Sequence, residues 1–335
     1  TTYMQRVDMT GIFAFNLPSG TIDPFSPDYD RSLDVQPIGA AGAKGGFGGA
    51  FFISLLDNTT HATIADGARI HSGSDGGFNV KAEEAIFSFA FNQAGGGGGK
   101  YGIGGTVSYV EQRSDTLAQL GGGAFVTGRN ARLYAGSLET QINWSGGVVK
   151  GEGIGLGASV SITDIARTTR AVVGAVEPPA STDADAQVRI DVTDGVDLLA
   201  KTDGALWTFA IAGAIVSDAP MKQTAEDPLD GAQAPANGAP AQQAPAKTGV
   251  GIAAAVSFNT VDDDTQASIA DAGTIHAATL SLQATSDTDL VAATGGLAFA
   301  KPDQSNNAAA LAGAYSKNIV GGDTLAFIVD TDAML

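Results

Sequence analysis

Apolar and polar residues alternate along most of this chain, in stretches that end at glycine, asparagine or aspartate. A period of two is the pattern of β-strands that bury one face. No stretch of useful length places apolar residues at the i, i+3, i+4 and i+7 positions of an amphipathic helix. The pattern therefore predicts an all-β protein, with strands of four to eight residues and few helices.

A five-residue motif with alanine at its centre returns five times. Its copies are Thr60–Ile64, Thr116–Leu120, Thr169–Val173, Thr265–Ile269 and Thr324–Ile328. Each copy follows a glycine-rich stretch that ends in a serine, ten residues before the alanine in four copies and eight in the first (Ser54). The alanines are 56, 53, 96 and 59 residues apart, and the 96-residue interval holds an insertion. These spacings predict about five imperfect repeats of 50–60 residues.

Two further strand patterns follow each motif. We expect the second strand of the repeat at 67–70, 123–126 and 273–275, and the third at 78–82, 131–135, 196–200 and 280–284. Small residues dominate the inward positions, where they stack on copies of themselves in successive coils. The fold class predicted is a right-handed parallel β-helix (β-solenoid), with coils of about 20 residues and so about three coils per repeat. An antiparallel barrel or roll is the alternative, but the Asp-Gly pairs lack hairpin spacing.

The charge of the chain excludes one class of partner. The net charge is −18, so a nucleic-acid backbone would be repelled, and anionic membrane surfaces are disfavoured for the same reason. The chain has no cysteine, which excludes disulfides and thiol chemistry. No apolar run has the length of a bilayer-spanning segment, so we expect no membrane insertion.

The ends of the chain and one insertion depart from the repeat. Residues 1–43 are proline-bearing and do not match it, which predicts a cap, a linker or a docking arm. Residues 44–335 form the repeat region, and 218–248 are a flexible insertion rich in proline and alanine. The chain begins without methionine and ends early in a fifth repeat, so we expect a piece of a longer protein.

A lysine stands near the start of each repeat. The five are Lys44, Lys100, Lys150, Lys247 and Lys301. In stacked coils they would form a loose stripe along one edge, as a ladder for anionic glycans or for acidic faces of sister molecules. The alternative is that they protect exposed edges from pairing with other chains.

Acidic residues suggest the one candidate metal site. Asp262, Asp263 and Asp264 directly precede a motif threonine, and they would bind calcium only with carboxylates from adjacent coils. Turn capping by aspartate is the alternative. His71 and His276 hold equivalent places three repeats apart, which indicates repeat inheritance rather than a metal site. We expect no other cofactor.

No pattern in the chain indicates catalysis. His-Glu-x-x-His and Gly-x-Ser-x-Gly are absent. The glycine-rich strings recur in every repeat and do not open helices, so they fail as nucleotide-binding fingerprints. We therefore expect no catalytic residues and no enzyme activity.

The string from Gly249 to Val261, followed by Thr265–Ile269, resembles repeats of very large bacterial surface proteins. These are the leukotoxin-like filamentous adhesins and their filamentous-haemagglutinin-like relatives, and the likeness covers roughly residues 44–335. The resemblance implies secretion by a Gram-negative bacterium, an extracellular or cell-surface location and a role in adhesion or biofilm. The resemblance does not imply that this chain has toxin activity.

Together these observations predict a non-enzymatic adhesive rod that makes weak, multivalent contacts. Its partners would be other copies of itself, neighbouring repeats of the parent protein or surface glycans. One alternative is a subunit of a self-assembling extracellular filament, in which a strand of one subunit completes the next. A second is a polysaccharide-active enzyme on the same fold, which a groove of clustered acids and basic residues would favour.

Overall fold

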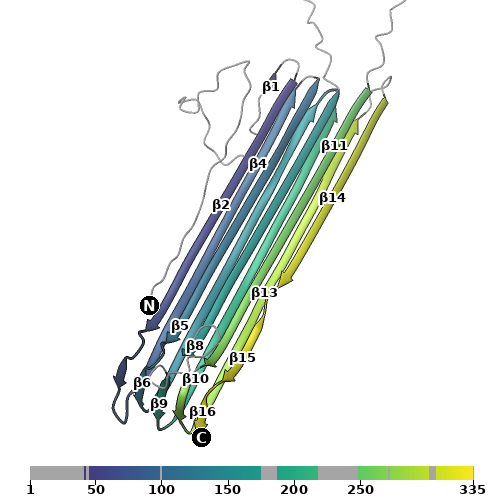
Figure 1. Ribbon diagram of the computed structural model, residues 1–335. Helices are drawn as coiled ribbons and strands as arrows, with labels where there is room; N and C mark the ends of the chain where they lie inside the picture. The colour runs from purple at the N-terminus through teal and green to yellow at the C-terminus, as the bar shows by residue number, and fades with distance from the viewer. Residues whose placement is uncertain are drawn as a thin grey trace, which may run out of the picture.

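The computed structural model describes residues 41–42, 45–98, 100–174, 187–217, 248–270, 272–301 and 307–334. Within these ranges every regular element is a β-strand, and the strands form three parallel sheets (Figure 1). The parallel β-solenoid predicted from the sequence is confirmed. The N-terminal segment 1–43 and the insertion 218–248 fall almost wholly outside the described residues, as do Lys44 and Lys247.

Two long sheets and one short sheet build the molecule, and strands are named here as in Figure 1. Sheet A has β1 (Ala41–Gly42), β4 (Gly77–Gly98), β7 (Asn130–Gly151), β10 (Gly195–Ser217) and β13 (Thr279–Lys301) in this order. Sheet B has β2 (Gly45–Ile64), β5 (Tyr101–Leu120), β8 (Ile154–Gly174), β11 (Thr248–Ala270) and β14 (Asn307–Gly321), with β15 (Thr324–Val329) also beside β11. Sheet C has β3 (Arg69–His71), β6 (Phe125–Gly128), β9 (Val188–Val192), β12 (Ala272–His276) and β16 (Asp332–Met334).

Each repeat makes one coil of the solenoid. The chain runs along a strand of sheet B, turns through sheet C at one end and returns along sheet A (Figure 1). The expectation of about three coils per repeat is wrong. Its cause is strand length, because most strands of sheets A and B have 20–23 residues where the sequence suggested four to eight.

The pairing register reproduces the sequence spacing of the motif. The five motif alanines lie in one row across sheet B: Ala62, Ala118, Ala171, Ala267 and Ala326. In sheet A, Val196 pairs with Ala131 and Leu280, which confirms the third strand of the weak third repeat. The assignment of Ser54 to the serine row is wrong, because Ser54 pairs with Val110 and Phe52 takes the place opposite Ser108.

The half of the long strands next to sheet C, called here the proximal half, has an ordinary core. Large and medium apolar side chains point inward and are buried, among them Leu120, Leu133, Leu198 and Ile269. The outward-facing positions of the same half carry ion pairs, such as the one between Lys81 Nζ and Glu83 Oε2 at 2.6 Å. This end of the molecule is stabilised mainly by burial of apolar area.

The other half, called here the distal half, comprises residues 45–56, 87–98, 101–112, 140–151, 154–165, 205–217, 248–261, 289–301 and 307–320. Its interior holds mostly small side chains, because sheets A and B approach closely there. A β-carbon on Gly48 would stand 1.7 Å from the carbonyl oxygen of Gly95, and one on Gly157 would stand 2.2 Å from that of Gly213. Serine, threonine and asparagine continue this interior toward the proximal half, as in the bond from Ser108 Oγ to Asn143 Oδ1 at 2.8 Å.

Candidate interaction groove

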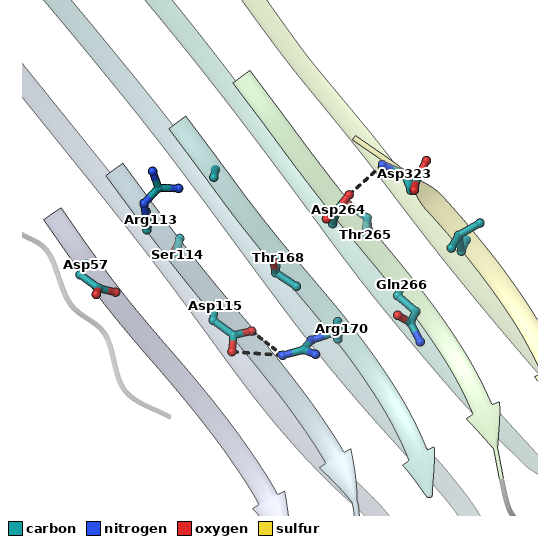
Figure 2. A pocket seen from close by; sticks show the side chains of 12 residues that line it. Asp57, Arg113, Ser114, Asp115, Thr168, Arg170, Asp264, Thr265, Gln266 and Asp323 are labelled. Atoms are coloured by element: carbon teal, nitrogen blue, oxygen red, sulfur yellow. Dashed lines mark hydrogen bonds and ion pairs between the residues drawn. The ribbon is translucent and has the colours of Figure 1, made fainter. Parts of the chain in front are cut away.

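A groove of about 560 Å³ crosses the outer face of sheet B where the two halves meet (Figure 2). Its lining comes from β2, β5, β8 and β11 and from the residues at the start of β15. Because each lining strand belongs to a different coil, the groove runs along the stacking direction. Its charged side chains are Asp57, Arg113, Asp115, Arg170, Asp264 and Asp323.

Ion pairs across strands hold the middle of the groove. Arg170 Nη2 donates to both carboxylate oxygens of Asp115, at 3.0 and 3.1 Å. His61 Nε2 lies 3.0 Å from the same carboxylate. Asp264 Oδ1 accepts a hydrogen bond from the backbone nitrogen of Asp323 at 2.9 Å. The first two contacts connect β2, β5 and β8, and the third connects β11 to the residue before β15.

The two ends of the groove carry unengaged carboxylates. The side chains of Asp57 and Asp323 have no hydrogen bond or ion pair with any other described residue. Arg113 at one margin is exposed and binds Glu111 at 3.0 Å, with Asp164 at 3.7 Å. Free carboxylates and an exposed guanidinium offer hydrogen bonds to a hydroxyl-bearing ligand that lies across the strands.

Directly beneath the groove lies a buried charge cluster. Arg167 points inward between Ala166 and Thr168 of the groove lining, and its Nε and Nη2 bind both oxygens of Asp263 at 2.7 and 2.6 Å. Arg167 also donates to Thr288 Oγ1 at 2.7 Å. Glu139 lies 3.7 Å from Arg167 Nε, and the side chains of both residues and of Asp263 are at most 3% exposed.

Electrostatics set the protonation of this cluster. Burial raises the pKa of Glu139 to about 7, and the nearby charges of Asp263 and Glu84 act in the same direction while Arg167 opposes them. Neither carboxylate oxygen of Glu139 has a hydrogen-bond partner. Burial disfavours the charge of Arg167, but its bond to Asp263 and the surrounding carboxylates outweigh burial and raise its pKa. Glu84 instead accepts hydrogen bonds from Ser114 and from Thr116, the latter at 2.9 Å.

The three consecutive aspartates do not converge. Asp263 points inward to Arg167, while Asp262 and Asp264 lie on the outer face of β11. They also stand in the middle of a continuous strand, so the turn-capping interpretation is wrong. Among the described residues no group of three or more histidine, cysteine, aspartate or glutamate side chains gathers to hold a metal ion.

The described lysines of the predicted stripe all lie at the distal end. Lys100 stands between β4 and β5, Lys150 near the end of β7, and Lys301 at the end of β13. All three are exposed. His71 and His276 share one row of sheet C, with Thr127 and Asp191 between them, as their equivalent places in the repeat predict.

Sequence reasoning missed both the groove and the cluster beneath it. Acids at Asp57, Asp115 and Asp323 stand at the same place in their repeats as the three aspartate candidates, but the candidates did not include Arg113, Arg170 or Arg167. The available signal was that every repeat has at least one charged residue in the four residues that end at the motif threonine, at 57–60 in the first copy and at the matching positions of the others.

Comparison with known protein families, curated proteins and solved structures finds no match for this chain. No described helix is long and apolar enough to cross a membrane.

Proposed function

We propose that this chain is a non-enzymatic structural and adhesive segment of a large secreted or cell-surface bacterial protein. The observation that carries the proposal is the groove, which crosses five stacked strands and holds two carboxylates that no other described side chain engages. A rigid solenoid that repeats such polar sites along its length gains strength from many weak contacts. The ligand class that fits is a polysaccharide, because its hydroxyl groups satisfy carboxylates and guanidinium groups along an extended path.

Binding of glycans to the purified 335-residue chain tests this proposal. A glycan array identifies the ligand, and titration calorimetry then compares the wild type with the double variant Asp57→Ala/Asp323→Ala. We expect the variant to lose at least about tenfold in affinity, since hydrogen bonds to charged groups contribute about 1.5–3 kcal/mol each.

The matched control is Asp191→Ala/Asp332→Ala, which removes the same charge at exposed positions of sheet C. It should bind as the wild type does. Absence of any glycan ligand, or equal loss in both double variants, would contradict a groove-based adhesive role.

A polysaccharide-active enzyme is the second candidate, because the groove does combine carboxylates with two arginines. Carboxylate pairs perform general acid and base chemistry on glycosidic bonds. Incubation of the chain with the bound polysaccharide, followed by assays for new reducing ends and unsaturated products, separates the two functions. Product that disappears in Asp115→Asn would establish the enzyme, and binding without product supports the adhesive segment.

A further inference from the structure

An apolar band covers the outer face of sheet A in the distal half. It consists of the outward-facing residues of 87–91, 142–148, 207–215 and 291–299. Both tryptophans of the chain lie in it. Phe91, Trp144 and Phe209 form a row across three strands, with ring centroids 6.5 and 5.2 Å apart.

The exposure of this band is not an effect of a sheet edge. Trp207 lies on β10, which is paired on both sides, and it is still 44% exposed. The side chains cannot turn inward, because the interior behind them is filled by close contact of the two sheets. Exposed apolar surface of this extent marks an interaction site.

The area of the band suits a protein interface. The band spans five, seven, nine and nine residues on its four strands, and with about 3.3 Å per residue and about 4.8 Å between strands its footprint is roughly 480 Å². Two such faces together bury roughly 950 Å², which is close to the lower limit of about 1,000 Å² for a specific interface and fits a weak dimer. Flat sheets pack face to face with interdigitated side chains, and aromatic residues contribute most to such contacts.

Charges at the two margins of the band select one orientation. Lys301 stands at the distal margin and Asp287 at the other, each seven residues from Thr294 on β13, and both are exposed. If two copies met with their strands parallel, the twofold axis would place β13 of one copy over β4 of the other, and neither Lys301 nor Asp287 would face its counterpart. With the strands antiparallel, Lys301 of one copy lies over Asp287 of the other.

We propose that two copies of this chain associate through the apolar band of sheet A, face to face and with their strands antiparallel. The resulting twofold dimer buries both tryptophans and pairs Lys301 with Asp287 at both margins. A lipid bilayer fits less well, because among the described residues β2 and β14 each have an unpaired edge, and open edges are not tolerated in hydrocarbon.

Sedimentation equilibrium of the full chain tests the dimer. We expect twice the chain mass of 33.6 kDa for the wild type. Trp207→Asp should weaken association by at least about tenfold, since it places a charge among the aromatic side chains of the interface. Phe125→Asp is the matched control, because Phe125 is 39% exposed on β6 of sheet C, outside the proposed interface. It should leave the dimer intact.

A charge swap tests the orientation and does not depend on the folding of the tryptophan variant. Asp287→Lys and Lys301→Asp should each weaken the dimer, and the double variant should restore it. A wild type that sediments at 33.6 kDa at high concentration would overturn the proposal, as would vesicle binding by a monomer. Longer assemblies that Trp207→Asp leaves unchanged would indicate stacking through the open edges, and would overturn it too.

Discussion

In the proximal half of the solenoid, large apolar side chains point inward and charged ones outward. In the distal half the interior holds mostly small and polar side chains, with a few larger ones such as Phe52 and Leu206, and aromatic side chains lie outside. The parallel pairing of neighbouring strands continues without a shift of register through both halves. The difference therefore comes from the separation of sheets A and B. Where the backbones nearly touch, as at Gly157 and Gly213, no large residue fits between them. Inward position along a strand does not by itself predict hydrophobicity.

The largest expected effect is at the junction of the two halves, where Arg167 neutralises buried carboxylates. Arg167→Met leaves Asp263 and Glu139 buried without a cation. Removal of one partner from a buried ion pair destabilises by about 3–5 kcal/mol. Urea unfolding measures this loss, and Arg113→Met at the exposed groove margin should change stability by less than about 0.5 kcal/mol. Equal stability of the two variants would show that the junction cluster does not hold the halves together.

The next effect is a pH dependence that originates in the same cluster. The pKa of Glu139 is raised from 4.5 to about 7 in the folded protein, so between these values the folded state holds a proton that the unfolded chain has lost. Its contribution to stability is complete below pH 4.5 and is lost as the pH rises through 7. The loss amounts to roughly 3 kcal/mol by pH 8.

Glu139→Gln should remove this slope, because an amide does not titrate. Urea unfolding between pH 4.5 and 8 checks it through the difference between wild type and variant. Asp332→Asn, at an exposed position of β16, should keep the wild-type slope. A slope that persists in Glu139→Gln would assign the pH dependence to other groups.

A smaller effect tests the close contact of the sheets in the distal half. Gly157→Ala places a methyl group 2.2 Å from the carbonyl oxygen of Gly213, so the sheets must separate locally. Overpacking of this kind destabilises by about 1–3 kcal/mol. Gly295→Ala is the control, since a β-carbon there meets nothing within 4 Å. Thermal unfolding of both variants decides whether the distal interior is as tight as the structure indicates.

Much of the architecture was predictable from the repeat. Because each motif alanine stacks on its counterpart, the sequence intervals of 56, 53, 96 and 59 residues equal the register offsets of sheet B. The strand lengths were not predictable from hydrophobicity. Along β5 the apolar side chains Val107 and Tyr109 point outward, whereas Ala118 and Leu120 point inward. In the sequence this shift of apolar residues from odd to even positions resembles a break between two separate strands.

The candidate site was less predictable, because its residues come from five different repeats. Alternation along β11 sends Asp263 inward and Asp264 outward, which three consecutive aspartates do not reveal. The pairing of Arg170 with Asp115 depends on strands 55 residues apart in sequence. The proximity of these residues could be predicted only from the pairing register of the strands, which follows from the spacing of the repeats.

The register also decides what this fold provides to a longer protein. Each coil consumes more than 50 residues and advances the stack by only about 4.8 Å, while a 20-residue strand extends about 66 Å across it. The five coils therefore form a plate that is much broader than it is tall. At this rate a column 100 Å tall would require more than about 1,000 residues. A chain with this fold therefore gains little height per residue, and it provides a broad, flat surface instead.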